Sequence, residues 1–576
     1  MFHSLKQILW PIEKSELKFF APLASIMFCA LFNFSVIRSL KDSIIVPILG
    51  AEAISFLKLW LVLPIAVIVT IIYAKLSNIF AINHIYYSIL AFFCIIFLLF
   101  AYHLYPYQHL YHIDEDLANK LISQYQYLKW PIKIFAKWSY ALMYVVADLW
   151  SAVIINLIFW QLCNHFINQP AAKRFYPTFG MIGNMGLIFG GITLIILSDA
   201  SFIPDSLAVA PRINSNEYLL RQKGGNHYVH ITNDHINHTS GIDKKNPSQL
   251  VLEKSDTKHS DFIVVKESIY NSDYDISTQK SLQSIITVVC IVSLLSMFLL
   301  KLFDKNVSYT LKNSKDNEKQ VLNLQHSTSA NKQIHSSKTT LSLKESLNMI
   351  LQSKYILRIT LMVMCYGLAI NILEGPWKAQ IRKVYPDYIH YIDFMGKFNI
   401  MLGIGAILFA FVGNWLFQRY SWIFAALFTP VIVGVTGSMF FILLVFGEQL
   451  NEHVLIIDSA FAAVFIGACQ NLISKASKYT IFDAAKEVTY IPLSVELKSK
   501  GKAAAEVVGY KFGKSMGAFL QSGIFVFFPF LHFEDISFYL MIVFVIVIIV
   551  WIDNVYKLNK ELQTKNNQVI IEDNKA

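Results

Sequence analysis

Long apolar stretches with almost no charged residues dominate this sequence of 576 residues. A helix needs about 20 such residues to cross the roughly 30 Å hydrocarbon layer of a membrane. Some stretches in the second half are shorter, so we expect their helices to be extended by turns that carry charge. The stretches cover residues 19–37, 59–74, 79–106, 138–164, 175–198 and 281–300, and then 359–373, 398–418, 420–447, 459–474, 515–533 and 536–552.

The composition supports a membrane protein. Hydrophobic residues make up 55% of the chain and charged residues only 15%, against roughly 25% charged in an average soluble domain. So few charges cannot cover the several soluble domains that a chain of this length would form. The sequence therefore predicts an all-α polytopic membrane protein with about twelve transmembrane helices, and it excludes a soluble enzyme, a disordered chain and a collagen-like fibre.

The twelve stretches fall into two sets of six, separated by a polar segment. This predicts an N-terminal half over 1–300, a cytoplasmic linker over 301–354, a C-terminal half over 355–556 and a cytoplasmic tail over 557–576. Two six-helix halves joined by a central linker are the usual layout of a major-facilitator-type transporter. A polar insertion at 199–280, with strand-like pieces at 227–232 and 261–265, is interpreted as a small extracytoplasmic lobe.

The net charge of +10 is better explained by basic cytoplasmic loops than by a nucleic-acid partner. If the N-terminus is cytoplasmic, the internal connections carry Lys75, Lys173, Arg174, Arg419 and the basic cluster 475–502, whereas the external connections 448–453 and 534–535 contain no Lys or Arg. Only the external loop 104–137, with four lysines, departs from this pattern. We therefore expect both termini in the cytoplasm.

Neither a disulfide framework nor a metal site is expected. All six cysteines lie in apolar runs, and none forms a CxxC pair. The spacing of His227, His230, His235 and His238 matches no familiar metal-binding pattern, so we interpret them as solvated loop histidines. No cofactor is expected.

Charged residues in or beside the spans are the strongest functional signal, because each costs on the order of 3 kcal/mol at the centre of a membrane helix. Asp148 lies ten residues into the fourth stretch. We interpret it as part of a transport pathway; the alternative is a structural carboxylate paired with a lysine of a neighbouring helix. Arg38 and Lys41 share one helix face after the first stretch, which favours an anion, although simple snorkelling toward the interface is the alternative.

The seventh stretch ends in a further group of charges. Pro376 disfavours helix at Gly375 and predicts unwound backbone there, which a membrane protein tolerates only against protein or a watery cavity. Glu374, with Lys378 and Arg382, is therefore predicted to line a cavity.

The segment 509–515 looks at first like a phosphate-binding loop. It has three residues between its glycines instead of four, and no strand precedes it, so an ATPase is disfavoured. The segment instead places Lys511 and Lys514 on one helix face, beside the small residues Ser515 and Gly517, which leaves room for a bulky polyanion.

Several ordered motifs together resemble the bacterial and plastid ATP/ADP translocase family, the nucleotide transporters of obligate intracellular bacteria and of plastids. The resemblance covers almost the whole chain except 199–280. It rests on IRSLKDS at 37–43, ADLW at 147–150, FYPTFG at 175–180, YG at 366–367 with ILEG at 372–375, QN at 470–471 with KYTIFD at 478–483, KE at 486–487 with YIPL at 490–493, GKAA at 501–504 and GKS at 513–515.

The resemblance implies a twelve-helix exchanger of the bacterial inner membrane in which the charges at Lys41, Asp148, Glu374 and Lys514 matter for transport. This chain departs from the family at Asp148, where glutamate is common, because the shorter carboxylate has less reach and could change affinity or substrate choice. The insertion 199–280 is a second departure, and no role is assigned to it.

The sequence thus predicts exchange of external ATP for internal ADP by alternating access. The cations for the phosphates would be Arg38, Lys41, Lys378, Arg382, Lys511 and Lys514, and Asp148 and Glu374 would hold those lysines in the empty site. The alternative cargo is another nucleotide such as GTP, GDP, CTP or UTP, with or without proton coupling. A membrane-embedded enzyme acting on a phosphorylated lipid is more remote, because no HExxH or clustered-aspartate motif is present. We expect a monomer in the lipid bilayer whose partners are its nucleotide substrates.

Overall fold

The computed structural model describes residues 12–13, 16–167, 169–199, 217–222, 228–232, 262–264, 272–314, 353–453, 458–493, 505, 509 and 511–573. The N-terminal helices are α2 (Leu17–Leu49), α3 (Ala53–Phe56), η1 (Leu57–Val62), α4 (Leu63–Ile79), α5 (Ile82–Leu99), η2 (Phe100–Leu104), α6 (Gln108–Tyr111), α7 (Glu115–Gln124), η3 (Gln126–Leu128), α8 (Lys129–Ala136), α9 (Trp138–Trp150), η4 (Ser151–Phe159), α10 (Trp160–Phe166), α11 (Gln169–Ser198) and α13 (Ser272–Ser314). The C-terminal helices are α16 (Lys354–Val384), α17 (Tyr388–Arg419), α18 (Trp422–His453), α19 (Ser459–Ser477), η8 (Lys478–Phe482), α20 (Asp483–Thr489), α22 (Lys511–Phe527) and α23 (Phe533–Asp573).

Ten helical spans in the described part of the chain are long and apolar enough to cross a membrane. The prediction of an all-α polytopic membrane protein is therefore confirmed. The other two predicted stretches, 459–474 and 515–533, form α19 and α22. Both are helical, but α19 buries a polar stripe and α22 is described over only 17 residues.

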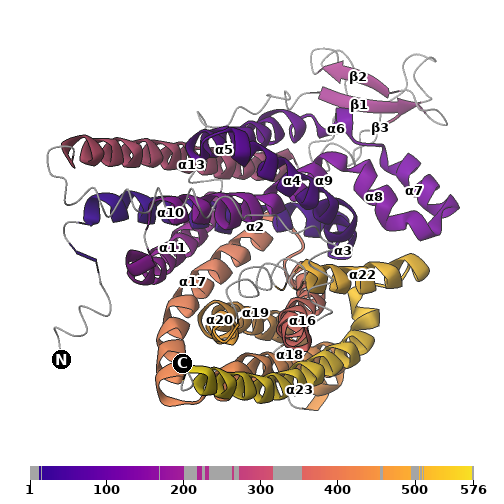
Figure 1. Ribbon diagram of the computed structural model, residues 1–576. Helices are drawn as coiled ribbons and strands as arrows, with labels where there is room; N and C mark the ends of the chain where they lie inside the picture. The colour runs from indigo at the N-terminus through magenta and orange to yellow at the C-terminus, as the bar shows by residue number, and fades with distance from the viewer. Residues whose placement is uncertain are drawn as a thin grey trace.

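The helices gather in two groups, with α2 to α13 in one and α16 to α23 in the other (Figure 1). The groups meet along α11 and α17, whose backbones touch: a Cβ at Gly191 would lie 2.5 Å from the carbonyl oxygen of Gly396. Glycine is needed at this crossing, as in other close contacts between membrane helices. Nearby, Asn399 of α17 donates a 2.8 Å hydrogen bond to Ser39 of α2.

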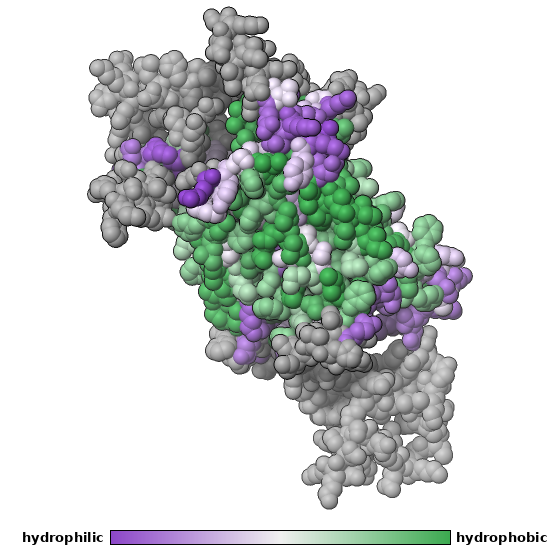
Figure 2. Space-filling model, turned by 90° about the horizontal axis from the view of Figure 1, so that it is seen from below, coloured by the Kyte–Doolittle hydropathy of each residue, from purple (hydrophilic) through white to green (hydrophobic). Residues whose placement is uncertain are grey.

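The surface of the helical bundle is apolar. Figure 2 shows a broad hydrophobic face with hydrophilic residues toward its margins. Large side chains such as Ile95, Leu294 and Phe298 are exposed along the spans. Apolar surface of this extent is unfavourable in water, so it fits a protein whose spans are covered by lipid.

The predicted unwinding at Gly375 and Pro376 is wrong, because α16 runs as one helix through both residues. A proline removes one backbone donor, and membrane helices tolerate this loss where neighbouring groups compensate. Gly375 serves packing instead: a Cβ there would lie 2.5 Å from the ring of Phe533 at the start of α23. The missing side chain lets these two helices approach closely.

Two helices extend beyond the predicted spans. α13 continues to Ser314, inside the predicted linker, and α23 continues to Asp573, through most of the predicted tail. On α23 a 2.5 Å ion pair joins Lys557 to Asp553 one turn earlier, and Glu561 pairs with Arg358 of α16 at 2.6 Å. Such charge pairs stabilise a helix after its apolar stretch has ended.

The insertion contains a small antiparallel sheet. Its strands are β1 (Glu217–Gln222), β2 (Tyr228–Thr232) and β3 (Phe262–Val264), in the order β2-β1-β3. Both predicted strand-like pieces form strands, which confirms them, whereas β1 is not indicated by the sequence pattern. His230 lies on β2; His227, His235 and His238 lie outside the described residues.

Candidate functional site

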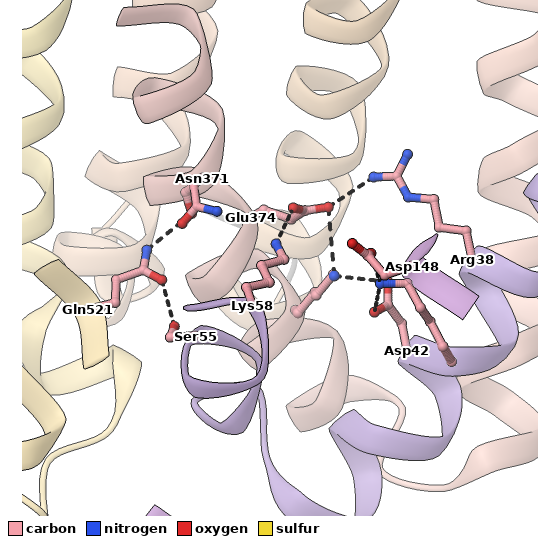
Figure 3. A network of polar contacts seen from close by, with 10 residues as sticks. Arg38, Asp42, Ser55, Lys58, Asp148, Asn371, Glu374 and Gln521 are labelled. Atoms are coloured by element: carbon pink, nitrogen blue, oxygen red, sulfur yellow. Dashed lines mark hydrogen bonds and ion pairs between the residues drawn. The ribbon is translucent and has the colours of Figure 1, made fainter. Parts of the chain in front are cut away.

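Buried charges from both groups of helices meet where α2, η1 and α16 approach one another (Figure 3). Glu374 of α16 accepts 2.9 Å hydrogen bonds from Arg38 of α2 and from Lys58 of η1. Lys378, one turn later on α16, has its ammonium 3.7 Å from the same carboxylate. Glu374 therefore ties two cations of the N-terminal half to the C-terminal half.

Asp42 is the matching carboxylate on the N-terminal side. It is buried, with its side chain 1% exposed, and its carboxylate lies 2.8 Å from the ammonium of Lys378 and 3.9 Å from that of Lys41. Lys378 thus bridges Asp42 and Glu374. These pairs form a continuous series of alternating charges across the boundary between the halves.

Lys41 also has a partner within its own half. Its ammonium lies 2.6 Å from the carboxylate of Asp148 on α9 and 3.8 Å from the centre of the Tyr144 ring, at cation–π distance. The side chain of Lys41 is 5% exposed and that of Asp148 is 35% exposed. Asp148 is therefore the more accessible member of the pair, and it does not bridge the halves.

A polar contact between the halves adjoins these pairs. Ser55 of α3 donates a 2.8 Å hydrogen bond to Gln521 of α22, and Gln521 donates at 3.1 Å to the carbonyl oxygen of Asn371 (Figure 3). These three residues line a small cavity together with Lys58 and Glu374.

Cations outnumber carboxylates in this region. We define the charge cluster by Arg38, Lys41, Asp42, Lys58, Asp148, Glu374 and Lys378. Two more lysines interact electrostatically with members of the charge cluster at longer range. Lys514 of α22 interacts with Lys58 and Asp148, and Lys475 of α19 interacts with Glu374. Without the exposed Lys514, five buried or half-buried cations thus face three carboxylates. Because buried charge without compensation is costly, this arrangement favours binding of a polyanion.

The structure brings most of the predicted site residues together. Arg38, Lys41, Asp148, Glu374 and Lys378 contact one another through ion pairs, and Lys514 lies within Coulombic range.

The two other predicted residues lie elsewhere or outside the description. Arg382 is on α16 one turn beyond Lys378, beside Gly50, where a Cβ would lie 3.2 Å from its guanidinium. Lys511 begins α22, but its side chain lies outside the described residues.

Sequence reasoning missed three charged residues, Asp42, Lys58 and Lys475. Asp42 lies inside the IRSLKDS motif, next to Lys41, and the prediction assigned a role only to the lysine. Lys58 immediately precedes the predicted span 59–74, and Lys475 immediately follows the predicted span 459–474. Each predicted span ended at its first charged residue, so both lysines were left outside. The helices continue through both lysines, so a charge that ends an apolar stretch was a usable signal.

A separate group of contacts closes the bundle at the end of α2. Glu52 is buried and accepts a 3.0 Å hydrogen bond from Nδ1 of His532 and a 3.4 Å bond from the backbone of Phe533. Lys129 of α8 donates at 2.9 Å to the carbonyl oxygen of Pro529. The N-terminal half is thereby fastened to the α22–α23 connection, on the face that the charge distribution predicts to be external.

Glu52 remains ionised over the physiological range. Burial opposes the charged form, but the hydrogen bonds from His532 and from the backbone outweigh it and lower the pKa of Glu52. A carboxylate with a lowered pKa contributes stability above its unfolded pKa of about 4.3, and this is lost only as the pH falls through the lower folded value. The contact at Glu52 should therefore persist between pH 8 and pH 5.

Replacing Glu52 with Gln should loosen this closure. The substitution keeps the shape but removes the charge, and because His532 is half-exposed we expect an effect of about 1 kcal/mol, or about fivefold in opening. Ser55→Cys provides the readout, because Ser55 is buried behind Glu52 and reaction with a membrane-impermeant maleimide reports opening. Glu534→Gln is the matched control, since Glu534 pairs with Lys383 within the same half. Equal labelling rates in both backgrounds would show that Glu52 does not hold this end closed.

Comparisons with known proteins agree on one family. The family described as "TLC ATP/ADP transporter" matches residues 1–221 and 256–562. The "ADP,ATP carrier protein 3" of Rickettsia prowazekii (strain Madrid E) is 43% identical over 560 residues, covering 97% of each chain. The "ADP,ATP carrier protein 4" of Rickettsia bellii (strain RML369-C) is 35% identical, covering 97% of this chain and 93% of that protein.

The family match leaves out only residues 222–255, so it extends into both ends of the insertion 199–280, which the predicted resemblance had excluded as a whole. Among solved structures, the nucleoside transporter NupG aligns with a TM-score of 0.49 and 11% identity, covering 94% of this chain and 99% of that chain. A match over most of the sequence, with full-length relatives of the same kind, leaves one assignment: the chain belongs to the TLC ATP/ADP transporter family.

Proposed function

We propose that this protein exchanges ATP for ADP across the bacterial inner membrane by alternating access, with the charge cluster as its phosphate-binding site. The observation that carries the proposal is the excess of buried and half-buried cations drawn from both halves. Its relatives, which span the same length, are named ADP,ATP carrier proteins. Membership of a transporter family, together with ten apolar spans among the described residues, makes the protein a multi-pass membrane transporter and not an enzyme.

The ion pairs suggest how binding is coupled to movement. In this conformation Arg38 and Lys58 are held by Glu374, and Lys378 is held by Asp42, so each pair spans the boundary between the halves. The triphosphate of a nucleotide carries about four negative charges, and it would compete with the carboxylates for these cations. Loss of the bridging pairs, compensated by the phosphates, would free the halves to rock around the bound nucleotide.

The same pairs account for exchange in place of one-way transport. An empty carrier that changed conformation would break three buried pairs without a replacement anion, at several kcal/mol for each charge left unpaired. A loaded carrier does not face this barrier. Exchange of ATP for ADP moves about one net charge, worth roughly 2.3 kcal/mol per 100 mV, so nucleotide gradients would largely set the direction.

Obligate exchange is directly testable. Liposomes that contain the protein and labelled internal ATP should lose the label rapidly when ATP or ADP is supplied outside, and at least tenfold more slowly in nucleotide-free buffer. GTP, CTP and UTP in the outer buffer test the alternative cargoes, and an imposed pH gradient tests proton coupling. Equal efflux with and without external nucleotide would contradict an exchanger, and stimulation by another nucleotide alone would reassign the cargo.

We also propose that the transporting unit is a monomer in the lipid bilayer with both termini in the cytoplasm. Every described contact in the charge cluster comes from one chain, so the site needs no second copy. The basic connections predicted to be internal support the orientation.

A further inference from the structure

We propose that Lys475, with the neighbouring buried side chains of Gln470 and Ser474 on α19, binds the phosphates of the transported nucleotide directly. The inference rests on the proposed function and adds a C-terminal binding surface that the ion pairs of the charge cluster do not include. It starts from buried polar atoms of α19 that have no hydrogen-bond partner in the described part of the chain.

Three neighbouring side chains on α19 share this property. The ammonium of Lys475, the amide nitrogen of Gln470 and the hydroxyl of Ser474 are all buried, and no described residue forms a hydrogen bond with any of them. Gln470 and Ser474 are one turn apart and share a helix face, and Lys475 lies about 100° around the helix from Ser474. Each can donate a hydrogen bond, and phosphate oxygens are strong acceptors.

Lys475 is the exceptional member of this group. It is 7% exposed, and the nearest compensation is the ring of Phe398, whose centre lies 5.4 Å from the ammonium. By contrast, Arg38, Lys41, Lys58 and Lys378 each lie within 3 Å of a carboxylate oxygen. A buried ammonium without such a partner destabilises the empty protein. We therefore expect a bound ligand to supply the missing negative charge.

The charges around Lys475 indicate that this ligand is an anion. Lys475 interacts electrostatically with Arg38, Lys378 and Lys514 as like charges, and with Glu374 as the opposite charge. Glu374 is already engaged by Arg38 and Lys58. No carboxylate of the charge cluster is therefore free to neutralise Lys475. An anion placed between α19 and α2 would face Lys475 from one half and Arg38 from the other.

A polyphosphate meets this requirement better than a monovalent anion. It offers several acceptor oxygens, enough for the three α19 donors and for the cations of the charge cluster at the same time. Because α19 belongs to the C-terminal half and Arg38 to the N-terminal half, the phosphates would contact both moving parts. Lys475 would then attract substrate without locking the empty carrier, which is the task of Glu374.

The test compares Lys475→Met with wild-type protein and with Lys397→Met. Met has a similar length without the charge, and Lys397 is an exposed lysine on α17 that pairs with Asp393 away from the charge cluster. Thermal unfolding of purified protein is followed with increasing AMP, ADP, ATP and pyrophosphate. Exchange is measured in liposomes in parallel.

We expect opposite effects on stability and binding. Without ligand, Lys475→Met should unfold at the wild-type temperature or above it, since a buried unpaired charge has been removed. The concentrations of ATP and pyrophosphate needed for half of the stabilisation should rise about tenfold, and that of AMP by no more than about twofold. Lys475→Arg should recover part of the affinity for ATP, and Lys397→Met should resemble wild type throughout.

Two results would overturn the role of Lys475. One is an unchanged response of Lys475→Met to ATP and pyrophosphate, and the other is a lowered unfolding temperature without ligand combined with normal binding, which would mark a structural lysine. The proposed function fails differently: wild-type protein would then respond to pyrophosphate but neither bind nor exchange ATP and ADP. The pyrophosphate comparison still decides the role of Lys475 in that case.

Discussion

Glu374→Gln is expected to reduce ATP/ADP exchange by about a hundredfold or more. The amide keeps the size of the side chain but cannot neutralise Arg38 and Lys58, which both bond to this carboxylate at 2.9 Å. Without this carboxylate to recover the two cations from the phosphates, bound nucleotide should be released slowly. In the empty protein, removing one member of a buried charge group typically costs about 3–5 kcal/mol, because the remaining charges stay buried without a partner. The empty protein should also unfold at a lower temperature.

Two further variants isolate the effect of the bridge. Glu374→Asp keeps the charge but shortens the side chain, so we expect partial exchange and near-normal thermal stability. Glu534→Gln removes a half-exposed carboxylate from the same half and should leave exchange unchanged. The bridge between the halves would be the wrong explanation if Glu374→Gln exchanged nucleotides at half the wild-type rate or more in liposomes.

Glu374 also shows how far the sequence could lead. Its place beside an apolar stretch marked it as functional, because a charge in that position is costly. The cavity interpretation relied on broken helix at Pro376, and the structure contains continuous helix there. The right residue was therefore found with the wrong local geometry. Proline statistics from water-soluble helices overestimate the effect of a single lost hydrogen bond inside a bundle.

Pairing was the part of the site that the sequence could not provide. Glu374 meets Arg38 and Lys58 across sequence separations of 336 and 316 residues. Only the packing of one half against the other brings them together, and one sequence carries no information about that packing. Arg382 illustrates the same limit. It follows Lys378 by one helical turn and looks equivalent, yet it lies beside Gly50, near the closed end of the bundle.

The two interpretations of Asp148 were a role in the transport pathway and a structural pair with a lysine. Asp148 does pair with a lysine of a neighbouring helix, as the structural interpretation supposed, but that lysine is Lys41 of the charge cluster. Pairing and participation in transport are therefore compatible. Because both residues belong to the N-terminal half, Asp148 cannot fasten the halves together as Glu374 does.

The second large effect is expected at Asp148, where the affinity for ATP should change together with the exchange rate. The carboxylate lies 2.6 Å from the ammonium of Lys41, where a bound phosphate would have to compete with it. Asp148→Asn should bind ATP more tightly and release it more slowly, because the competitor has gone. We expect the half-saturating ATP concentration and the maximal exchange rate each to fall by about tenfold, as loss of one charge-assisted bond allows.

Asp148→Glu distinguishes competition from proton transfer. The longer carboxylate can still displace phosphate from Lys41, so exchange should remain within about threefold of wild type. If Asp148 instead carries a proton, Asp148→Asn should abolish uptake driven by a pH gradient while sparing exchange between equal nucleotide pools. Both modes can be measured in the same liposomes. A raised half-saturating concentration in Asp148→Asn would mean that Asp148 orients Lys41 toward the phosphate, and normal behaviour in both modes would remove this carboxylate from the transport mechanism.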